Sequence, residues 1–285
     1  MFASDQYALL DFGDGRKLER FGEFVLDRPA PAAKGRPKRP RLWDAADSRF
    51  ERSLKGQQGR WEDRTEFPDS WSIRWQHLCI ELKRNPHGHL GVFPEQSENW
   101  AWLGQQGTTR DRPLQLLNLF AYTGGATLAA ASAGASITHV DAAENMVQRA
   151  RRNASASSLE TANIRWIVDD AVSFVDREIR RERLYDGVIL DPPAYGHGGH
   201  HRTWQFERDL PKLLSQCWQL TAGMPKLFLF TCHATGWNPK HLRSFLHERC
   251  DDVPEAKLSC KKLSILSKDE QPLSAGLVAR WCCHE

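Results

Sequence analysis

The feature that most constrains the fold is the stretch LNLFAYTGGATLAA, residues 117–130, where an apolar run stops at Thr123-Gly124-Gly125 and an Ala-rich run follows. The apolar run predicts a buried strand, and the alanines predict a helix. Because two adjacent glycines separate the runs, we expect the chain to pass from strand to helix through a tight turn. Such a unit is typical of a parallel α/β sheet.

Strand and helix patterns then alternate to the end of the chain. The expected strands lie near residues 114–120, 136–141, 164–168, 185–190 and 226–232. Two final runs, near 256–265 and 275–283, are expected to complete the sheet. This alternation predicts an α/β fold, a Rossmann-like doubly wound sheet, over residues 105–285.

Residues 1–104 are expected to form a small β-rich, basic module that binds substrate. A hairpin is predicted around Gly13-Asp14-Gly15, because Asp-Gly between apolar runs is a strong turn signal. SIRWQHLCIELKR, residues 72–84, is expected to form one strand, which pairs with HLGVFPEQ, residues 89–96.

Acidic residues follow two of the expected strands. In a doubly wound sheet, ligands bind outside the carboxyl ends of the strands, where a glycine turn and a helix start can hold a carboxylate. Asp141, at the end of ITHVD, is placed to accept hydrogen bonds from two ribose hydroxyls, and Asp170 to accept from an adenine amino group. Either acid could equally be a solvated cap. A nicotinamide site is not expected, because the turn TGGATL lacks the G-x-G-x-x-G pattern.

The motif Asp-Pro-Pro-Ala-Tyr, residues 191–195, ends another buried strand. Its two prolines stiffen the loop, remove two backbone donors and leave the loop carbonyls available as acceptors. Asp191 and a proline carbonyl can accept from the edge of a planar base while Tyr195 stacks on its face. The alternative is an ordinary proline-rich turn.

The motifs LFAYTGG, HVDAAENMVQRARRNAS, VDDAVSFV and YDGVILDPPAYG together resemble the class I S-adenosylmethionine-dependent methyltransferases. Within these they are similar to the group that modifies bases of large-subunit ribosomal RNA. GHLGVFPEQSENW, residues 88–100, is similar to the Gln-containing hairpin that precedes the cofactor site in that group. The resemblance covers roughly residues 88–283 and implies the strand order 3-2-1-4-5-7-6.

The resemblance also implies roles for particular residues, with S-adenosyl-L-methionine as cofactor and large-subunit ribosomal RNA as partner. Asp191 and Tyr195 fall on the loop that holds the target base. The positions implied for the cofactor are Gln96, Tyr122, Thr123, Gly124, Gly125, Asp141 and Asp170.

Cys232 decides which atom is methylated. It ends the run KLFLFTC, beside the strand that ends at Asp191, and a thiolate there could add to C6 of a pyrimidine and activate C5. A cysteine stands at this strand end in the cytosine-5 branch of the resembled family, but here His233 and Ala234 follow in place of small hydroxyl residues. His233 could act as a base or cap the strand. If Cys232 is only a packing residue, methylation of a nitrogen, such as guanine N7, is the alternative.

A basic segment precedes these motifs. Between Arg28 and Arg64 there are 11 Lys or Arg against 5 Asp or Glu, and several of the chain's 11 tryptophans lie nearby. Cations with interleaved aromatics suit RNA phosphates and unpaired bases, although a solvated flexible arm is an equal alternative. Two rival functions remain, a small-molecule methyltransferase and a non-catalytic RNA-binding factor.

Composition excludes other classes of protein. No apolar run reaches the roughly 18 residues of a membrane-spanning helix, and the N-terminus does not resemble a signal peptide. Seven cysteines without framework spacing predict a reducing compartment, the cytoplasm. His197, His200 and His201 lie in a Gly-rich loop expected to close over substrate, with Arg202 as a phosphate contact. No metal is expected, because no acids stand at ligand spacing.

Overall fold

The computed structural model describes residues 1–53, 58–106, 112–197, 203–234, 236–248 and 258–283. The chain forms two compact units. The N-terminal unit comprises Met1–Ser97 and Ser264–Ala275, and the C-terminal unit comprises Glu98–Leu263 and Gly276–Glu285.

The N-terminal unit is built on a five-stranded sheet with the order β1-β2-β3-β4-β5. Its strands are β1 (Tyr7–Gly13), β2 (Arg16–Phe21), β3 (Phe24–Pro29), β4 (Ser48–Arg52) and β5 (Gly59–Asp63). The hairpin predicted around Gly13-Asp14-Gly15 is confirmed, because β1 and β2 pair across a turn in which Asp14 and Gly15 have φ of 50° and 75°. Both values are in the left-handed region that such a two-residue turn requires.

The remainder of the N-terminal unit corrects one prediction. Residues 72–84 do not form a single strand, since the chain reverses at Gln76, whose φ is 51°. The strands β6 (Trp71–Trp75) and β7 (Leu78–Leu82) pair with each other instead. The apolar residues change phase at this turn, from the odd positions of β6 to the even positions of β7, with Gln76 and His77 between them. This phase change indicates the reversal, and the prediction of one strand overlooked it. Two short helices complete the unit, α1 (Pro40–Trp43) and η1 (Pro94–Gln96).

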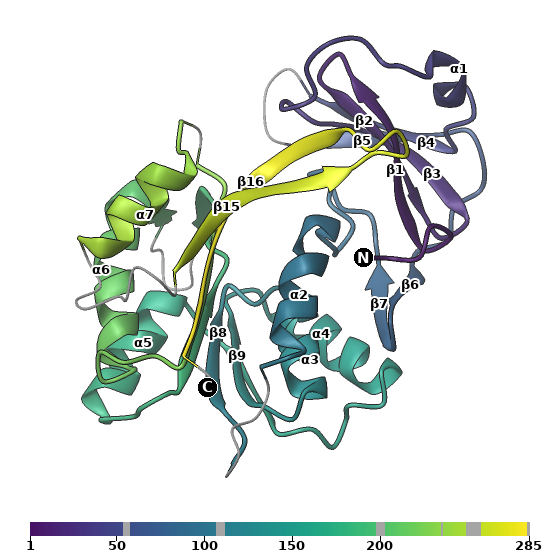
Figure 1. The fold of residues 1–285 in the computed structure, drawn as a ribbon. Helices are drawn as coiled ribbons and strands as arrows, with labels where there is room; N and C mark the ends of the chain where they lie inside the picture. The colour runs from purple at the N-terminus through teal and green to yellow at the C-terminus, as the bar shows by residue number, and fades with distance from the viewer. Residues whose placement is uncertain (54–57, 107–111, 198–202, 235, 249–257, 284–285) are drawn as a thin grey trace. The chain divides into compact units, whose positions relative to one another are not determined.

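The C-terminal unit contains the predicted doubly wound sheet (Figure 1), with the order β10-β9-β8-β11-β14-β16-β15. Numbered along the chain, this is the order 3-2-1-4-5-7-6 that the resemblance implied. The strands are β8 (Gln115–Leu119), β9 (Ser136–Asp141), β10 (Ile164–Val168), β11 (Gly187–Leu190), β14 (Leu227–Cys232), β15 (Ser259–Leu266) and β16 (Pro272–Cys282). The first five strands in this sheet order, from β10 to β14, are parallel, and β16 pairs with β14 in the antiparallel direction.

Helices cover both faces of this sheet (Figure 1). They are α2 (Ser97–Leu103), α3 (Gly125–Ser132), α4 (Glu144–Ala156), α5 (Ala171–Arg180), α6 (Phe206–Gln219) and α7 (Pro239–His247). Side chains of α5, α6 and α7, such as Val172, Leu213 and Leu242, join strand residues such as Val188 and Phe230 in one buried apolar cluster. Among the described helices, none is long and apolar enough to cross a membrane.

The register of the parallel strands places their carboxyl ends along one edge. Leu119 lies opposite both Val140 and Leu190, and Leu190 lies opposite Phe230. The strand order reverses between β8 and β11, and the crevice outside this point is where doubly wound sheets bind ligands. The glycine turn, Asp141, Asp170 and the Asp-Pro-Pro motif all follow strands that end at this edge or lie at their last residue.

Candidate functional site

The glycine turn connects β8 to α3. Tyr122 has φ of 51° and Gly124, the N-cap of α3, has φ of 90°. A Cβ on Gly125 would lie 2.4 Å from Cζ2 of Trp100, and one on Gly124 would lie 3.0 Å from Cβ of Ala150. Both glycines are therefore required by close packing, and they leave the first N–H groups of α3 accessible from the strand-end edge.

Asp141 connects this turn to the next strand. Its Oδ2 accepts a hydrogen bond from the backbone N–H of Tyr122 at 2.8 Å, and its Oδ1 accepts from that of Ala143 at 2.9 Å. Burial raises the pKa of Asp141, while these two donors act in the opposite direction. Because each carboxylate oxygen can accept more than one hydrogen bond, Asp141 can hold the turn and still accept from two ribose hydroxyls.

A buried polar chain supports the start of α3, and the sequence analysis did not identify it. The amide of Asn118 donates to the hydroxyl oxygen of Thr127 at 2.8 Å, and this hydroxyl lies 2.9 Å from Nδ1 of His139. Burial lowers the pKa of His139 to about 3. The sequence signal was present, since Asn118 and His139 are polar residues inside apolar strands.

Asp170 caps a helix. It is the N-cap of α5, and its Oδ1 accepts from the backbone N–H of Ser173 at 2.9 Å. The carboxylate is buried. One of the two roles considered from the sequence, a cap, is therefore present, and a contact to adenine through the other oxygen stays a prediction.

Asp191, directly after β11, has partners from the neighbouring strand end. The hydroxyl of Thr231 donates to Oδ1 of Asp191, and Nε2 of His233 lies 3.0 Å from the same oxygen. A Cβ on Gly276 would lie 2.8 Å from Nδ1 of His233, so the imidazole packs against the β16 backbone. The side chains of Asp191 and His233 are each about one third exposed and accessible to a substrate.

The Asp-Pro-Pro loop is held to the glycine turn by Trp204. Its indole N–H donates to the carbonyl of Pro193 at 2.7 Å, and its ring lies 4.9 Å from that of Phe120. One lone pair of the Pro193 carbonyl therefore accepts from the indole, and the contact of a proline carbonyl with a base stays a prediction. Tyr195 is 49% exposed and begins β12 (Tyr195–His197), which pairs with β13 (Thr203–Gln205). Its ring is accessible for stacking.

Cys232 lies in the apolar cluster. Its side chain is 1% exposed, and burial raises the pKa of the thiol to about 11. Successive side chains on a strand point to opposite faces, and the preceding residue, Thr231, contacts Asp191. The thiol therefore faces away from that contact and is protonated at neutral pH.

The structure does not test the remaining predictions for this site. Gln96 is buried in η1 and belongs to the N-terminal unit, so its contact with the cofactor stays a prediction. His200, His201 and Arg202 lie outside the described residues. Within the described ranges, no group of three or more His, Cys, Asp or Glu side chains is arranged to hold a metal ion.

Known proteins share these features. A family model described as S-adenosylmethionine-dependent methyltransferase matches residues 58–231. Ribosomal RNA large subunit methyltransferase K/L from Shewanella loihica is 31% identical over 138 residues, which are 48% of this chain and 18% of the relative. Ribosomal RNA large subunit methyltransferase I from Tolumonas auensis is 30% identical over 120 residues, which are 41% of this chain and 28% of the relative. The chain thus spans less than a third of the length of these relatives.

The solved structures include a similar protein of comparable length. The S-adenosylmethionine-dependent methyltransferase from Agrobacterium tumefaciens is 34% identical, with a TM-score of 0.88. The match covers 97% of this chain and 90% of that chain, so both units have counterparts in it.

Proposed function

The chain belongs to the S-adenosylmethionine-dependent methyltransferase family, and we propose that it transfers a methyl group to a base of large-subunit ribosomal RNA. The observation that carries the proposal is the arrangement at one sheet edge of the glycine turn, Asp141, Asp170 and the Asp191 loop. The names of the relatives from Shewanella loihica and Tolumonas auensis support the choice of substrate.

The residues present fit the cofactor. Gly124 and Gly125 let α3 begin in close contact with Ala150 and Trp100, and the N-terminus of α3 offers backbone N–H groups to a carboxylate, beside Thr123. Asp141 accepts from the ribose hydroxyls, and Asp170 accepts from the adenine amino group. When bound, S-adenosylmethionine supplies a methyl group activated by a sulfonium. Tyr122 positions the turn through its backbone N–H on Asp141.

The acceptor base is held by the second half of the site. Asp191 accepts from an N–H on the edge of the base, and Tyr195 stacks on its face. Nε2 of His233 lies 3.0 Å from Asp191, so it donates to this carboxylate and orients it toward the edge of the base. Transfer to a ring nitrogen with a lone pair, such as guanine N7, needs only orientation, because that nitrogen carries no proton. An N–H nitrogen also releases a proton, which Asp191 on the base edge can accept.

We favour a ring or exocyclic nitrogen over cytosine C5 as the methylated atom. The C5 route needs Cys232 as a thiolate that reaches the base, whereas its side chain is 1% exposed and its pKa is raised to about 11. The pair formed by Asp191 and His233 supports nitrogen methylation without a covalent intermediate.

The experiment is methyl transfer from radiolabelled S-adenosylmethionine to unmodified large-subunit RNA, followed by digestion and mass spectrometry of the nucleosides. We expect a labelled guanosine or another nitrogen-methylated nucleoside. Asp191→Asn should abolish transfer while the cofactor still binds. The matched control is Asp176→Asn, which changes a carboxylate on α5 whose partners are Gln216 and Lys212.

Each other outcome points to a different function. Labelled 5-methylcytidine, lost in Cys232→Ala, would overturn the nitrogen assignment and make Cys232 the nucleophile. Cofactor binding without labelled RNA would favour a small-molecule methyltransferase, and RNA binding without turnover would favour a non-catalytic factor.

A further inference from the structure

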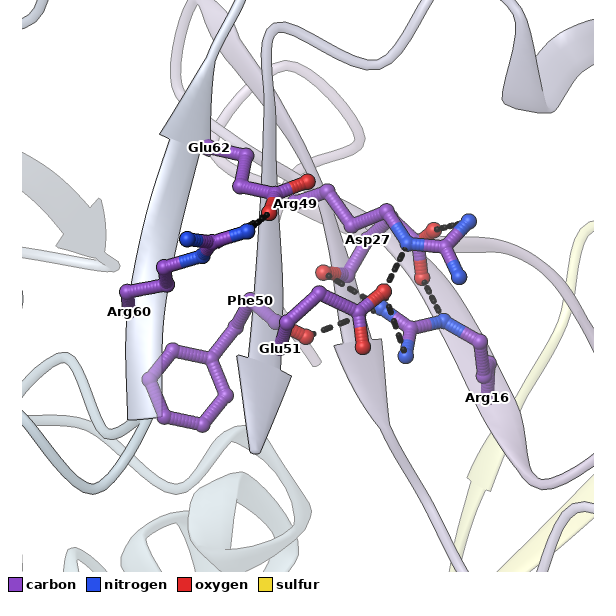
Figure 2. A network of polar contacts seen from close by, with 7 residues as sticks. All are labelled: Arg16, Asp27, Arg49, Phe50, Glu51, Arg60 and Glu62. Atoms are coloured by element: carbon purple, nitrogen blue, oxygen red, sulfur yellow. Dashed lines mark hydrogen bonds and ion pairs between the residues drawn. The ribbon is translucent and has the colours of Figure 1, made fainter. Parts of the chain in front are cut away.

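Three arginines on the N-terminal sheet are paired with acids (Figure 2). Arg16 lies 2.7 Å from Asp27, and Arg49 lies 3.4 Å from the same carboxylate. Arg60, on the adjacent strand, lies 2.7 Å from Glu62. These three arginines are neutralised locally, so they offer little unbalanced charge to a polyanion.

The loop between β3 and β4 has a different charge balance. Residues 30–43, which we call the basic loop, contain five cations and no acidic residue. One of them, Arg39, is paired with Asp269. The other four are exposed and form no ion pair with any described residue: Lys34, Arg36, Lys38 and Arg41.

The turn of the first hairpin holds one half of this basic loop. The backbone N–H of Asp14 donates to the carbonyl of Gly35 at 2.7 Å, and that of Gly15 donates to Ala33 at 2.8 Å. A Cβ on Gly13 would lie 2.3 Å from the backbone nitrogen of Pro37, so the loop and the strand are in backbone contact there.

Asp11, a buried carboxylate in β1, holds the other half. Its oxygens accept from the backbone N–H groups of Lys38 at 3.1 Å and Arg39 at 2.8 Å, and from the indole N–H of Trp43 at 2.8 Å. Asp11 is 4% exposed, and it therefore organises the backbone of the basic loop without lying among its exposed cations. The sequence left two alternatives for the basic segment, an RNA-binding surface and a flexible arm. These contacts hold the backbone of the basic loop in place, which does not agree with a flexible arm there.

We propose that the basic loop is a preformed binding surface for the phosphate backbone of the substrate RNA. This inference rests on the proposed function. Four exposed cations on a fixed backbone can contact phosphates with a small loss of conformational entropy on binding. A flexible arm of the same charge would lose more conformational entropy. The contacts are independent of sequence, so the basic loop supplies affinity and orientation and the Asp191 loop selects the base.

The first test measures how RNA binding depends on salt. Filter binding of a large-subunit RNA fragment is compared for the full chain, Arg36→Gln/Lys38→Gln and the charge-matched control Arg180→Gln/Arg183→Gln. The control removes two exposed cations from the C-terminal unit. Two lost phosphate contacts should lower the slope of log K against log salt by about 1.5. The control should keep the original slope.

The second test separates preformed geometry from net charge. Asp11→Ala and Asp14→Asn each remove one negative charge near the basic loop, but only Asp11→Ala releases its backbone. We expect Asp11→Ala to bind RNA about tenfold more weakly although its net charge is more positive. Asp14→Asn should bind equally well or more tightly. Unchanged cofactor affinity and an unchanged unfolding temperature check that both variants are folded.

Failure of this proposal is distinguishable from failure of the proposed function. The full chain could methylate RNA while Arg36→Gln/Lys38→Gln shows the same dependence of binding on salt as the control. The basic loop would then not be the RNA surface, and an acidic protein would become its candidate partner. Tighter binding by Asp11→Ala would overturn the preformed geometry. If the unmodified chain shows no salt-dependent RNA binding, the proposed function fails first.

Discussion

The buried imidazole of His139 makes the stability of the C-terminal unit depend on pH. Its pKa is about 3 in the folded protein, against about 6.5 for an unperturbed histidine, because burial disfavours the charged form. The hydroxyl oxygen of Thr127 accepts from Asn118 and lies 2.9 Å from Nδ1 of His139. Charging the imidazole would put a positive charge beside this buried chain, which supports the start of α3.

The magnitude follows from the two pKa values. Below about pH 6.5 the unfolded chain binds a proton at this position and the folded chain does not, so stability falls as pH falls and continues to fall until about pH 3. At about pH 5 the loss from His139 alone is about 2 kcal/mol relative to neutral pH.

The assay compares the unmodified chain with His139→Gln, which cannot titrate but keeps an acceptor for Thr127. Urea unfolding followed by tryptophan fluorescence at about pH 7.5 and about pH 5 gives the free energy of unfolding of each. We expect the variant to lose about 2 kcal/mol less between these values. His89, whose pKa burial lowers to about 4, contributes equally to both proteins and cancels. Equal losses in the two proteins would refute the reasoning.

Three further predictions concern other positions in the site. Gly125→Ala should destabilise the chain by about 1 to 3 kcal/mol and weaken cofactor binding, because the new Cβ would overlap Trp100. Thermal unfolding and cofactor titration measure the two effects. Adding Trp100→Leu to this variant should restore part of the lost stability. Cys232 should resist iodoacetamide at about pH 8, since its pKa is about 11; rapid labelling detected by mass spectrometry would show that the thiol is accessible. Asp170→Ala should lower the free energy of unfolding, measured in urea, by about 1 kcal/mol, because the helix cap is lost. Asp170→Asn should keep most of this stability. If Asp170 contacts adenine, Asp170→Asn should still lose cofactor affinity.

Much of the fold was predictable because its signals are local. The alternation of apolar runs and helical patterns predicted the parallel strands, and Gly124 and Gly125 marked the turn before α3 correctly. The failure at Gln76 was a missed local signal, since the apolar positions change from odd to even numbers between Trp75 and Leu78, where the chain turns. The candidate site was predictable as positions on strand ends, because the carboxyl ends of parallel strands meet at one edge.

The sequence by itself determined which residues occupy that edge, since the hydrophobic pattern and the turn residues place each of them at a strand end. The strand order was implied by the resemblance to the methyltransferases. Only the tertiary structure decided their chemical state. Cys232 and His233 are adjacent in the chain, yet packing by distant helices buries the thiol and raises its pKa, while the imidazole lies beside Asp191. Likewise, Asp11 holds a loop that begins about twenty residues later in the chain, and Ser264–Ala275 belongs to the N-terminal unit. Burial and partners arise from segments distant in sequence, so no local pattern encodes them.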